Sequence, residues 1–100
     1  MILTVFRSRV KPEIQPEYMQ WVGRMTALAK EMPGFISHKV FVAHDGERVA
    51  IVEFESEEAQ RAWRLHPEHI DAQRKGRSAF YVEYRVQVCR VLRDSGSPGT

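Results

Sequence analysis

The side chains best suited to chemistry gather in one short segment, Trp63-Arg64-Leu65-His66-Pro67-Glu68-His69. It brings an indole and two imidazoles together around a proline, which cannot continue a regular helix. An imidazole titrates near neutral pH and can act as a general base, while an indole offers a flat apolar surface and an N–H donor. We therefore predict a pocket here, with His69 as base or substrate anchor and Trp63 as a platform for a flat aromatic. The alternatives are a surface histidine and a core tryptophan.

His66 is interpreted as a cap or hydrogen-bond partner at the helix break, and it is also a candidate for substrate contact. His66 and His69 are three positions apart, so they would share one face of a regular helix. A metal site would need a third ligand, for which His38 or His44 could be proposed. Nothing in the sequence places either of them near this segment, so no metal site is predicted.

The elements that must position this segment follow a simple order. Apolar alternation and β-branched residues predict strands over 2–10, 35–43, 49–54 and 79–92. Helical spacing predicts helices over 16–32 and 56–76, with a kink at Pro67 and a C-cap at Gly76. The order βαββαβ predicts an α+β, ferredoxin-like fold with a four-stranded antiparallel sheet.

Strict alternation along each strand predicts which side chains share a face. On the second strand it groups Phe35 with Phe41 and opposes both to Val40. On the last strand it sends Tyr81 and Tyr84 to opposite faces, so that at most one of them can reach a pocket directly.

Apolar residues lie on both faces of several strands, as Leu3 and Val5 do opposite Phe6. Both helices cover the same face of a ferredoxin-like sheet, so the other face would be exposed in a monomer. We therefore expect a homodimer packed sheet against sheet. On this face Arg85 would form an interface pair; if its face lined the pocket instead, Arg85 could hold an anionic substrate oxygen.

The chain has 100 residues and a formal net charge of +2. This fits one domain, residues 1–93, followed by a flexible Ser/Gly/Pro-rich tail at 94–100. The balanced charge argues against nucleic acid, and no apolar run is long enough to cross a membrane. Cys89 is the single cysteine, and its strand position predicts a buried, inert thiol. The absence of a signal-peptide pattern and of disulfides indicates the cytoplasm.

With this order of elements, residues 1–92 resemble the antibiotic biosynthesis monooxygenase (ABM) family of the dimeric α/β-barrel superfamily. The resemblance depends most on Trp63 with His66-Pro67-Glu68-His69 and on Phe80-Tyr81-Val82-Glu83-Tyr84. Weaker support comes from Met32-Pro33-Gly34-Phe35 and Glu53-Phe54-Glu55-Ser56. The family implies a homodimer with one pocket per subunit, between sheet and helices. Its members include oxygenases of anthrone- or quinol-type aromatics, haem-degrading enzymes, polyketide cyclases and lactone isomerases.

Comparison by position narrows these activities. Haem-degrading members carry an Asn on the first strand and a haem-ligating His ten residues after the tryptophan, where this chain has Phe6 and Gln73. Haem is therefore judged an unsuitable cofactor. Cofactor-free oxygenases place a protonatable residue six positions after the tryptophan, and related cyclases use the second His of a His-Pro-x-His segment as base. Both comparisons fall on His69.

The resemblance therefore implies cofactor-independent monooxygenation of a small aromatic substrate, with Trp63 and His69 as catalytic residues. The implied substrate contacts are His66, Phe6, Gln73, Arg85 and Tyr84. Two alternatives stay open. One is an O₂-independent polyketide cyclase or isomerase that uses the same pocket, and the other is a non-catalytic dimer that binds a small ligand or haem.

Overall fold

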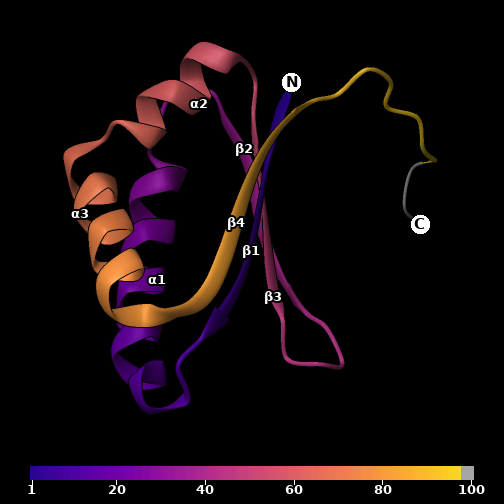
Figure 1. Ribbon diagram of the computed structural model, residues 1–100. Coiled ribbons are helices and arrows are strands. Elements are labelled where there is room, and N and C mark those ends of the chain that lie inside the picture. The colour runs from indigo at the N-terminus through magenta and orange to yellow at the C-terminus, as the bar shows by residue number, and fades with distance from the viewer. Residues whose placement is uncertain (98–100) are drawn as a thin grey trace.

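In a computed structural model, which describes residues 1–97, one antiparallel sheet carries helices on a single face (Figure 1). The elements are β1 (Ile2–Val10), a 3-10 turn (Pro12–Ile14), α1 (Gln15–Lys30), β2 (Phe35–Val42), β3 (Arg48–Phe54), α2 (Glu57–Arg64), α3 (Pro67–Lys75), a π-helical turn (Gly76–Phe80) and β4 (Tyr81–Arg90). The strand order is β2-β3-β1-β4, and every neighbouring pair is antiparallel. The predicted α+β, ferredoxin-like fold is confirmed.

The break at Pro67 divides the predicted second helix into α2 and α3. The hydroxyl of Ser56 begins α2 by accepting the Ala59 N–H at 3.1 Å, as an N-cap does. His66 begins α3 in the same way, because its Nδ1 accepts the Glu68 N–H at 3.2 Å. Pro67 then occupies the first helical turn, where its missing N–H is not needed. The predicted capping role of His66 is confirmed.

Two shifts of register make the strict alternation predicted for the strands wrong. The pairing of β2 with β3 shifts between Phe35 and Ser37, and Phe35 turns into the core with Val40 on its side of the sheet, while Phe41 points outward and is 47% exposed. The pairing of β1 with β4 shifts between Arg9 and Val10. An irregularity of this kind inserts a residue into one strand and re-aims the neighbouring side chains.

As expected, α3 ends at Lys75 with Gly76 as its C-cap residue, but this cap does not have the left-handed conformation typical of glycine. Gly76 keeps a right-handed helical conformation with φ −58°, and the chain continues through a π-helical turn to Phe80. Gly76 is buried, and a Cβ at this position would overlap the ring of Tyr81. The glycine therefore allows the Tyr81 ring to pack against the backbone, and it does not act as a left-handed C-cap.

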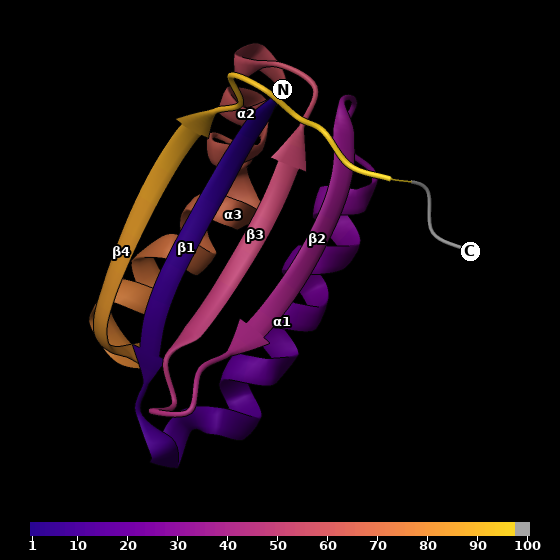
Figure 2. The same ribbon diagram turned by 90° about the vertical axis from the view of Figure 1, so that its right-hand side faces the viewer.

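The core lies between the helices and the inner face of the sheet, where Ala29, Phe54 and Trp63 are buried together. Figure 2 shows the other face of the sheet, which no helix covers. Leu3 and Cys89 are paired across β1 and β4 on this outer face. Because β4 is an edge strand with nothing packed on its outer face, Cys89 is exposed, and the prediction of a buried thiol is wrong for the single chain.

Within residues 1–97, no helix is both long and apolar enough to cross a membrane. Residues 94–97 of the predicted tail belong to no helix or strand. Residues 98–100 lie outside the described part of the chain.

The close packing of α2 on the turn before β2 can be tested by substitution of Gly34. It has φ +84°, and a Cβ there would lie 2.6 Å from the Cβ of Ala59. We expect Gly34→Ala to lower the free energy of unfolding by about 1–3 kcal/mol, measured by urea denaturation. Gly23→Ala is the control, because nothing lies within 4 Å of a Cβ at that helical position. It should raise the free energy by up to ~1 kcal/mol; equal effects of the two changes would contradict the packing described.

Candidate functional site

A cavity of about 350 Å³ lies between the inner face of the sheet and the helices. Its floor is formed mainly by β1 and β3, and α1, α2 and α3 form its walls. Along β4 it is open, since Tyr84, Val86 and Val88 line it and yet remain 45%, 50% and 51% exposed. An apolar stripe that faces a cavity and is half exposed can be covered by an apolar ligand.

His69 and Trp63 form the centre of one end of this cavity. Their rings are stacked, with centroids 4.1 Å apart and an angle of 12° between their planes. The Nδ1 of His69 lies 3.0 Å from the carbonyl oxygen of Trp63. A carbonyl oxygen only accepts hydrogen bonds, so Nδ1 carries the proton and the Nε2 of the neutral ring keeps its lone pair. Nε2 is the atom that can take a proton from a ligand.

The helix break explains why the Trp63 carbonyl is available. In an unbroken helix this oxygen would accept the N–H of the residue four positions later. That residue is Pro67, which has no N–H. The oxygen instead accepts the His66 N–H at 3.1 Å and the Nδ1–H of His69 at 3.0 Å. The proline thus determines both the break and the orientation of the imidazole.

Two histidines of the cavity favour the neutral form. Burial lowers the pKa of His69 below the ordinary value of 6.5, partly opposed by its hydrogen bond to the Trp63 carbonyl and aided by nearby His66. Burial also lowers the pKa of His38, with contributions from Lys30 and Arg48. A histidine with a lowered pKa is uncharged at pH 7 and can accept a proton.

The register brings His38, on β2, into the same cavity as His69, a proximity that the sequence did not indicate. His44 instead lies exposed in the turn between β2 and β3. Within residues 1–97, no group of three or more His, Cys, Asp or Glu side chains is placed to hold a metal ion.

Aromatic hydroxyls and an arginine lie at the other end of the cavity. The rings of Tyr18 and Tyr81 are 5.8 Å apart, and the guanidinium of Arg48 lies 5.2 Å from the centre of the Tyr18 ring. Tyr81 and Tyr84 both line the cavity, with ring centroids 5.6 Å apart. The prediction that these two tyrosines point to opposite faces is therefore wrong. Burial raises the pKa of Tyr81, and neighbouring Tyr18 adds to the rise, so the phenol remains a neutral donor.

Most of the residues predicted to form the site line this cavity: Trp63, His69, Phe6, Gln73 and Tyr84. His66 caps α3 and is not among the lining residues. Arg85 is paired with Arg7 on the outer face of the sheet, so it does not line the cavity either. The arginine of the cavity floor is Arg48 at the start of β3. Arg48 could have been identified as a cavity residue only from the strand register, which the sequence pattern does not reveal.

Gln73 makes a contact that bears on haem. Its Nε2 donates to the carbonyl oxygen of Arg64 at 3.1 Å and so joins α3 to the end of α2. The remaining amide oxygen is a poor ligand for haem iron, which proteins hold with His, Cys, Met or Tyr. The residues present therefore do not fit the haem site of the haem-degrading members.

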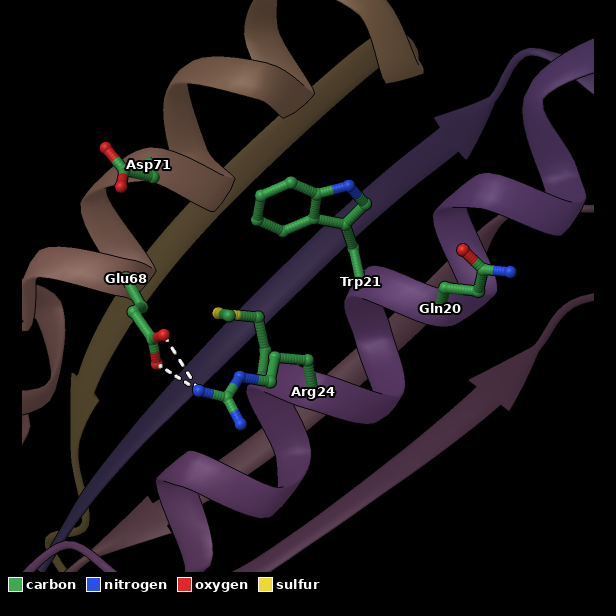
Figure 3. A pocket seen from close by; sticks show the side chains of 6 residues that line it. Gln20, Trp21, Arg24, Glu68 and Asp71 are labelled. Carbon is green, nitrogen blue, oxygen red and sulfur yellow. Dashed lines mark hydrogen bonds and ion pairs between the residues drawn. The ribbon is translucent and has the colours of Figure 1, made fainter.

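A second groove lies between α1 and α3 (Figure 3). Arg24 on α1 bridges the groove and contacts both carboxylate oxygens of Glu68, at 2.8 and 3.1 Å. Trp21 and Met25 line both the groove and the inner cavity. These two side chains therefore form the layer that separates the cavity from the helical surface.

Comparison with known proteins agrees with this architecture. The model of the antibiotic biosynthesis monooxygenase family matches residues 1–75. The uncharacterized protein YqjZ of Bacillus subtilis (strain 168) is 37% identical over 89 residues, which cover 89% of this chain and 78% of that protein. The chain belongs to the antibiotic biosynthesis monooxygenase family, as its sequence predicted.

Solved structures share the fold at low sequence identity. Rv0793 from Mycobacterium tuberculosis superimposes with a TM-score of 0.83 at 17% identity, over 95% of this chain and 98% of that one. SnoaB from Streptomyces nogalater, described as a cofactor-independent oxygenase, gives a TM-score of 0.77 at 18% identity, over 93% and 94% of the two chains. The same arrangement of helices on one face of a four-stranded sheet is thus found in both.

The lowered pKa values of His38 and His69 predict a pH-dependent stability. The unfolded chain binds protons near pH 6.5, whereas the folded chain resists them until a lower pH. The stability that these two histidines contribute is therefore fully present above pH 6.5, and it is lost as the pH falls toward their pKa values in the folded chain. We expect a lower melting temperature at about pH 5.5 than at about pH 7.5, and a smaller difference in His69→Gln. His44→Gln should keep the wild-type difference; an unchanged difference in His69→Gln would contradict the assignment.

Proposed function

We propose that this protein is a cofactor-independent monooxygenase of a small anthrone- or quinol-like aromatic, with His69 as the base. The observation that carries the proposal is the state of His69. Its Nδ1 is held by the Trp63 carbonyl, its pKa is lowered by burial, and its Nε2 is left as an acceptor. A base of this kind, in a mostly apolar cavity, is what deprotonation of an acidic phenol or anthrone requires.

The proposed reaction begins with transfer of a proton from the substrate to Nε2 of His69. The resulting carbanion or phenolate passes one electron to O₂, and the two radicals combine to a peroxide. In an anthrone the peroxide loses water, so that CH₂ and O₂ become C=O and H₂O. The neutral Tyr81 phenol supplies a hydrogen bond to a developing oxyanion, and the Trp63 ring beside His69 supports a flat substrate.

Cofactor independence is supported by two observations. The haem-ligand position is Gln73, which is engaged with Arg64, and SnoaB with the same fold is described as a cofactor-independent oxygenase. We propose the cytoplasm as the location, because Cys89 is the single cysteine of the sequence and a thiol without a disulfide partner is typical of a reducing compartment.

Oxygen uptake by the metal-stripped protein, with a panel of anthrones and hydroquinones, tests this proposal. We expect uptake above the spontaneous rate, and a loss of about 100-fold or more in His69→Ala because a general base is removed. In the wild type the rate should rise with pH up to the lowered pKa of His69 and then level off. Trp63→Phe should weaken substrate binding.

His44→Gln is the matched control, because His44 lies in the exposed turn away from the cavity. Its oxygen uptake should equal that of the wild type. No uptake from folded protein across the panel would contradict monooxygenation. Product formed without O₂, and lost in His69→Ala, would instead indicate the cyclase or isomerase activity. Ligand binding without any turnover would indicate a binding protein.

We also propose that the functional unit is a homodimer packed through the outer face of the sheet. This face carries Leu3, Val5 and Ile51 on its central strands, and no helix covers it (Figure 2). A second copy would bury these apolar side chains, and a two-fold axis makes the same surface serve both subunits.

Val5→Lys tests the dimer, because Val5 lies on central strand β1 between Ile51 and Gln87. We expect sedimentation equilibrium to give a dimer for the wild type and a monomer for Val5→Lys, since a lysine there would be buried without a partner. Gln20→Lys, on the exposed surface of α1, should remain dimeric. A monomeric wild type would contradict this arrangement.

A further inference from the structure

The charged side chains that line the cavity are all basic. Arg48, Arg64 and Arg77 belong to its lining, and no Asp or Glu does. In the described residues 1–97, the ion pairs are made by other basic residues, and none of these three arginines has a carboxylate partner. The cavity therefore has a positive potential that an anionic ligand would neutralise.

Arg48 is the member of this group whose surroundings indicate a ligand. Arg64 and Arg77 are exposed, whereas Arg48 is half-buried on the inner face at the start of β3. Its contact with the Tyr18 ring, at 5.2 Å, gives modest stabilisation. A partly buried guanidinium without a carboxylate loses hydration that a cation–π contact restores only in part. A ligand anion would provide the missing charge-assisted hydrogen bonds.

Polar hydrogen-bonding groups surround the same end of the cavity. Tyr18 and Tyr81 are adjacent there, and Ser8, 2% exposed, is paired with Arg48 across β1 and β3. Within residues 1–97, the buried hydroxyl of Ser8 has no hydrogen-bond partner. The Ser8 hydroxyl is not among the side chains that line the cavity, so the groups that can bind an anionic oxygen at this end are the Arg48 guanidinium and the two neighbouring phenols.

The strand register gives the approximate length of the cavity floor between Arg48 and the contact of α2 with β1. Ser8 is paired with Arg48, whereas Thr4 accepts a hydrogen bond from Gln60 at 3.4 Å, one turn before Trp63 on α2. Four residues of strand separate Thr4 from Ser8, which at ~3.3 Å per residue is roughly 13 Å. A ligand that spans both ends is elongated, with two or three fused rings.

We infer that the cavity binds an elongated aromatic acid, with its phenolic ring beside Trp63 and His69 and its carboxylate at Arg48, Tyr18 and Tyr81. This inference rests on the proposed function in taking the substrate to be aromatic. It adds the charge of the substrate and the residues that select it. The acid group anchors the far end and so aligns the reactive ring with Nε2 of His69.

Isothermal titration calorimetry with 6-hydroxy-2-naphthoate and 6-hydroxy-2-naphthamide tests the inference. The two probes have the same rings and phenol and differ in the charge of the far group. We expect the acid to bind at least tenfold more tightly than the amide, and this preference to disappear in Arg48→Gln through weaker binding of the acid alone. Arg74→Gln is the matched control, since Arg74 is exposed on α3 and does not line the cavity.

Equal affinities of acid and amide in the wild type, or no binding of either, would overturn the inference. The same holds for a preference that Arg48→Gln retains. If circular dichroism shows that Arg48→Gln does not fold, the inference is tested by the comparison of acid and amide in the wild type and in Arg48→Lys, which keeps the charge. These outcomes are distinguishable from a failure of the proposed function. Binding that is selective for the acid, without oxygen uptake, would contradict monooxygenation but not the acid preference. Equal oxygen uptake with acid and neutral substrates would contradict the acid preference but not monooxygenation.

Discussion

The hydrogen bond from the His69 ring to the Trp63 carbonyl is the interaction on which the candidate site depends. It exists because Pro67 leaves that carbonyl without its helical partner. One missing N–H therefore ends α2, starts α3, and fixes the imidazole with Nδ1 protonated and Nε2 available. The stacked Trp63 ring restricts the same imidazole from the side, and burial keeps it neutral. Backbone chemistry, packing and acid–base state are thus coupled at a single position.

The sheet arranges the remaining groups around this base. Antiparallel pairing brings His38 on β2, Arg48 on β3 and Tyr84 on β4 to one face, although they are far apart in sequence. The irregularity between β1 and β4 and the π-helical turn before β4 bring Tyr81 to that face as well. Gly76 leaves room for its ring. The polarity of the cavity is therefore divided, with a neutral base at one end and a cationic, hydroxyl-rich group at the other.

The two sheet faces have different roles. The inner face is the one on which the helices lie, and it carries the cavity, which is open along β4. The outer face combines apolar side chains with ion pairs, among them Arg7–Glu47 at 3.0 Å and Arg9–Asp45 at 2.7 Å. Cys89 and Arg85 belong to this outer face, so Cys89 is exposed in the single chain, and Arg85 lies where an interface pair is expected and does not line the cavity. Position along a strand did not reveal which face the helices cover.

The sequence by itself determined the order of elements, the helix break at Pro67 and the pairing of Trp63 with His69, because these depend on local periodicity and on residues close in the chain. It did not determine register, bulges or the helical turn beyond Gly76, because these follow from contacts between distant segments. Only the tertiary structure decided that Arg48 and Tyr81 share the cavity with His69. A one-residue shift in pairing moves a side chain from one face of a sheet to the other, and no local pattern records such a shift.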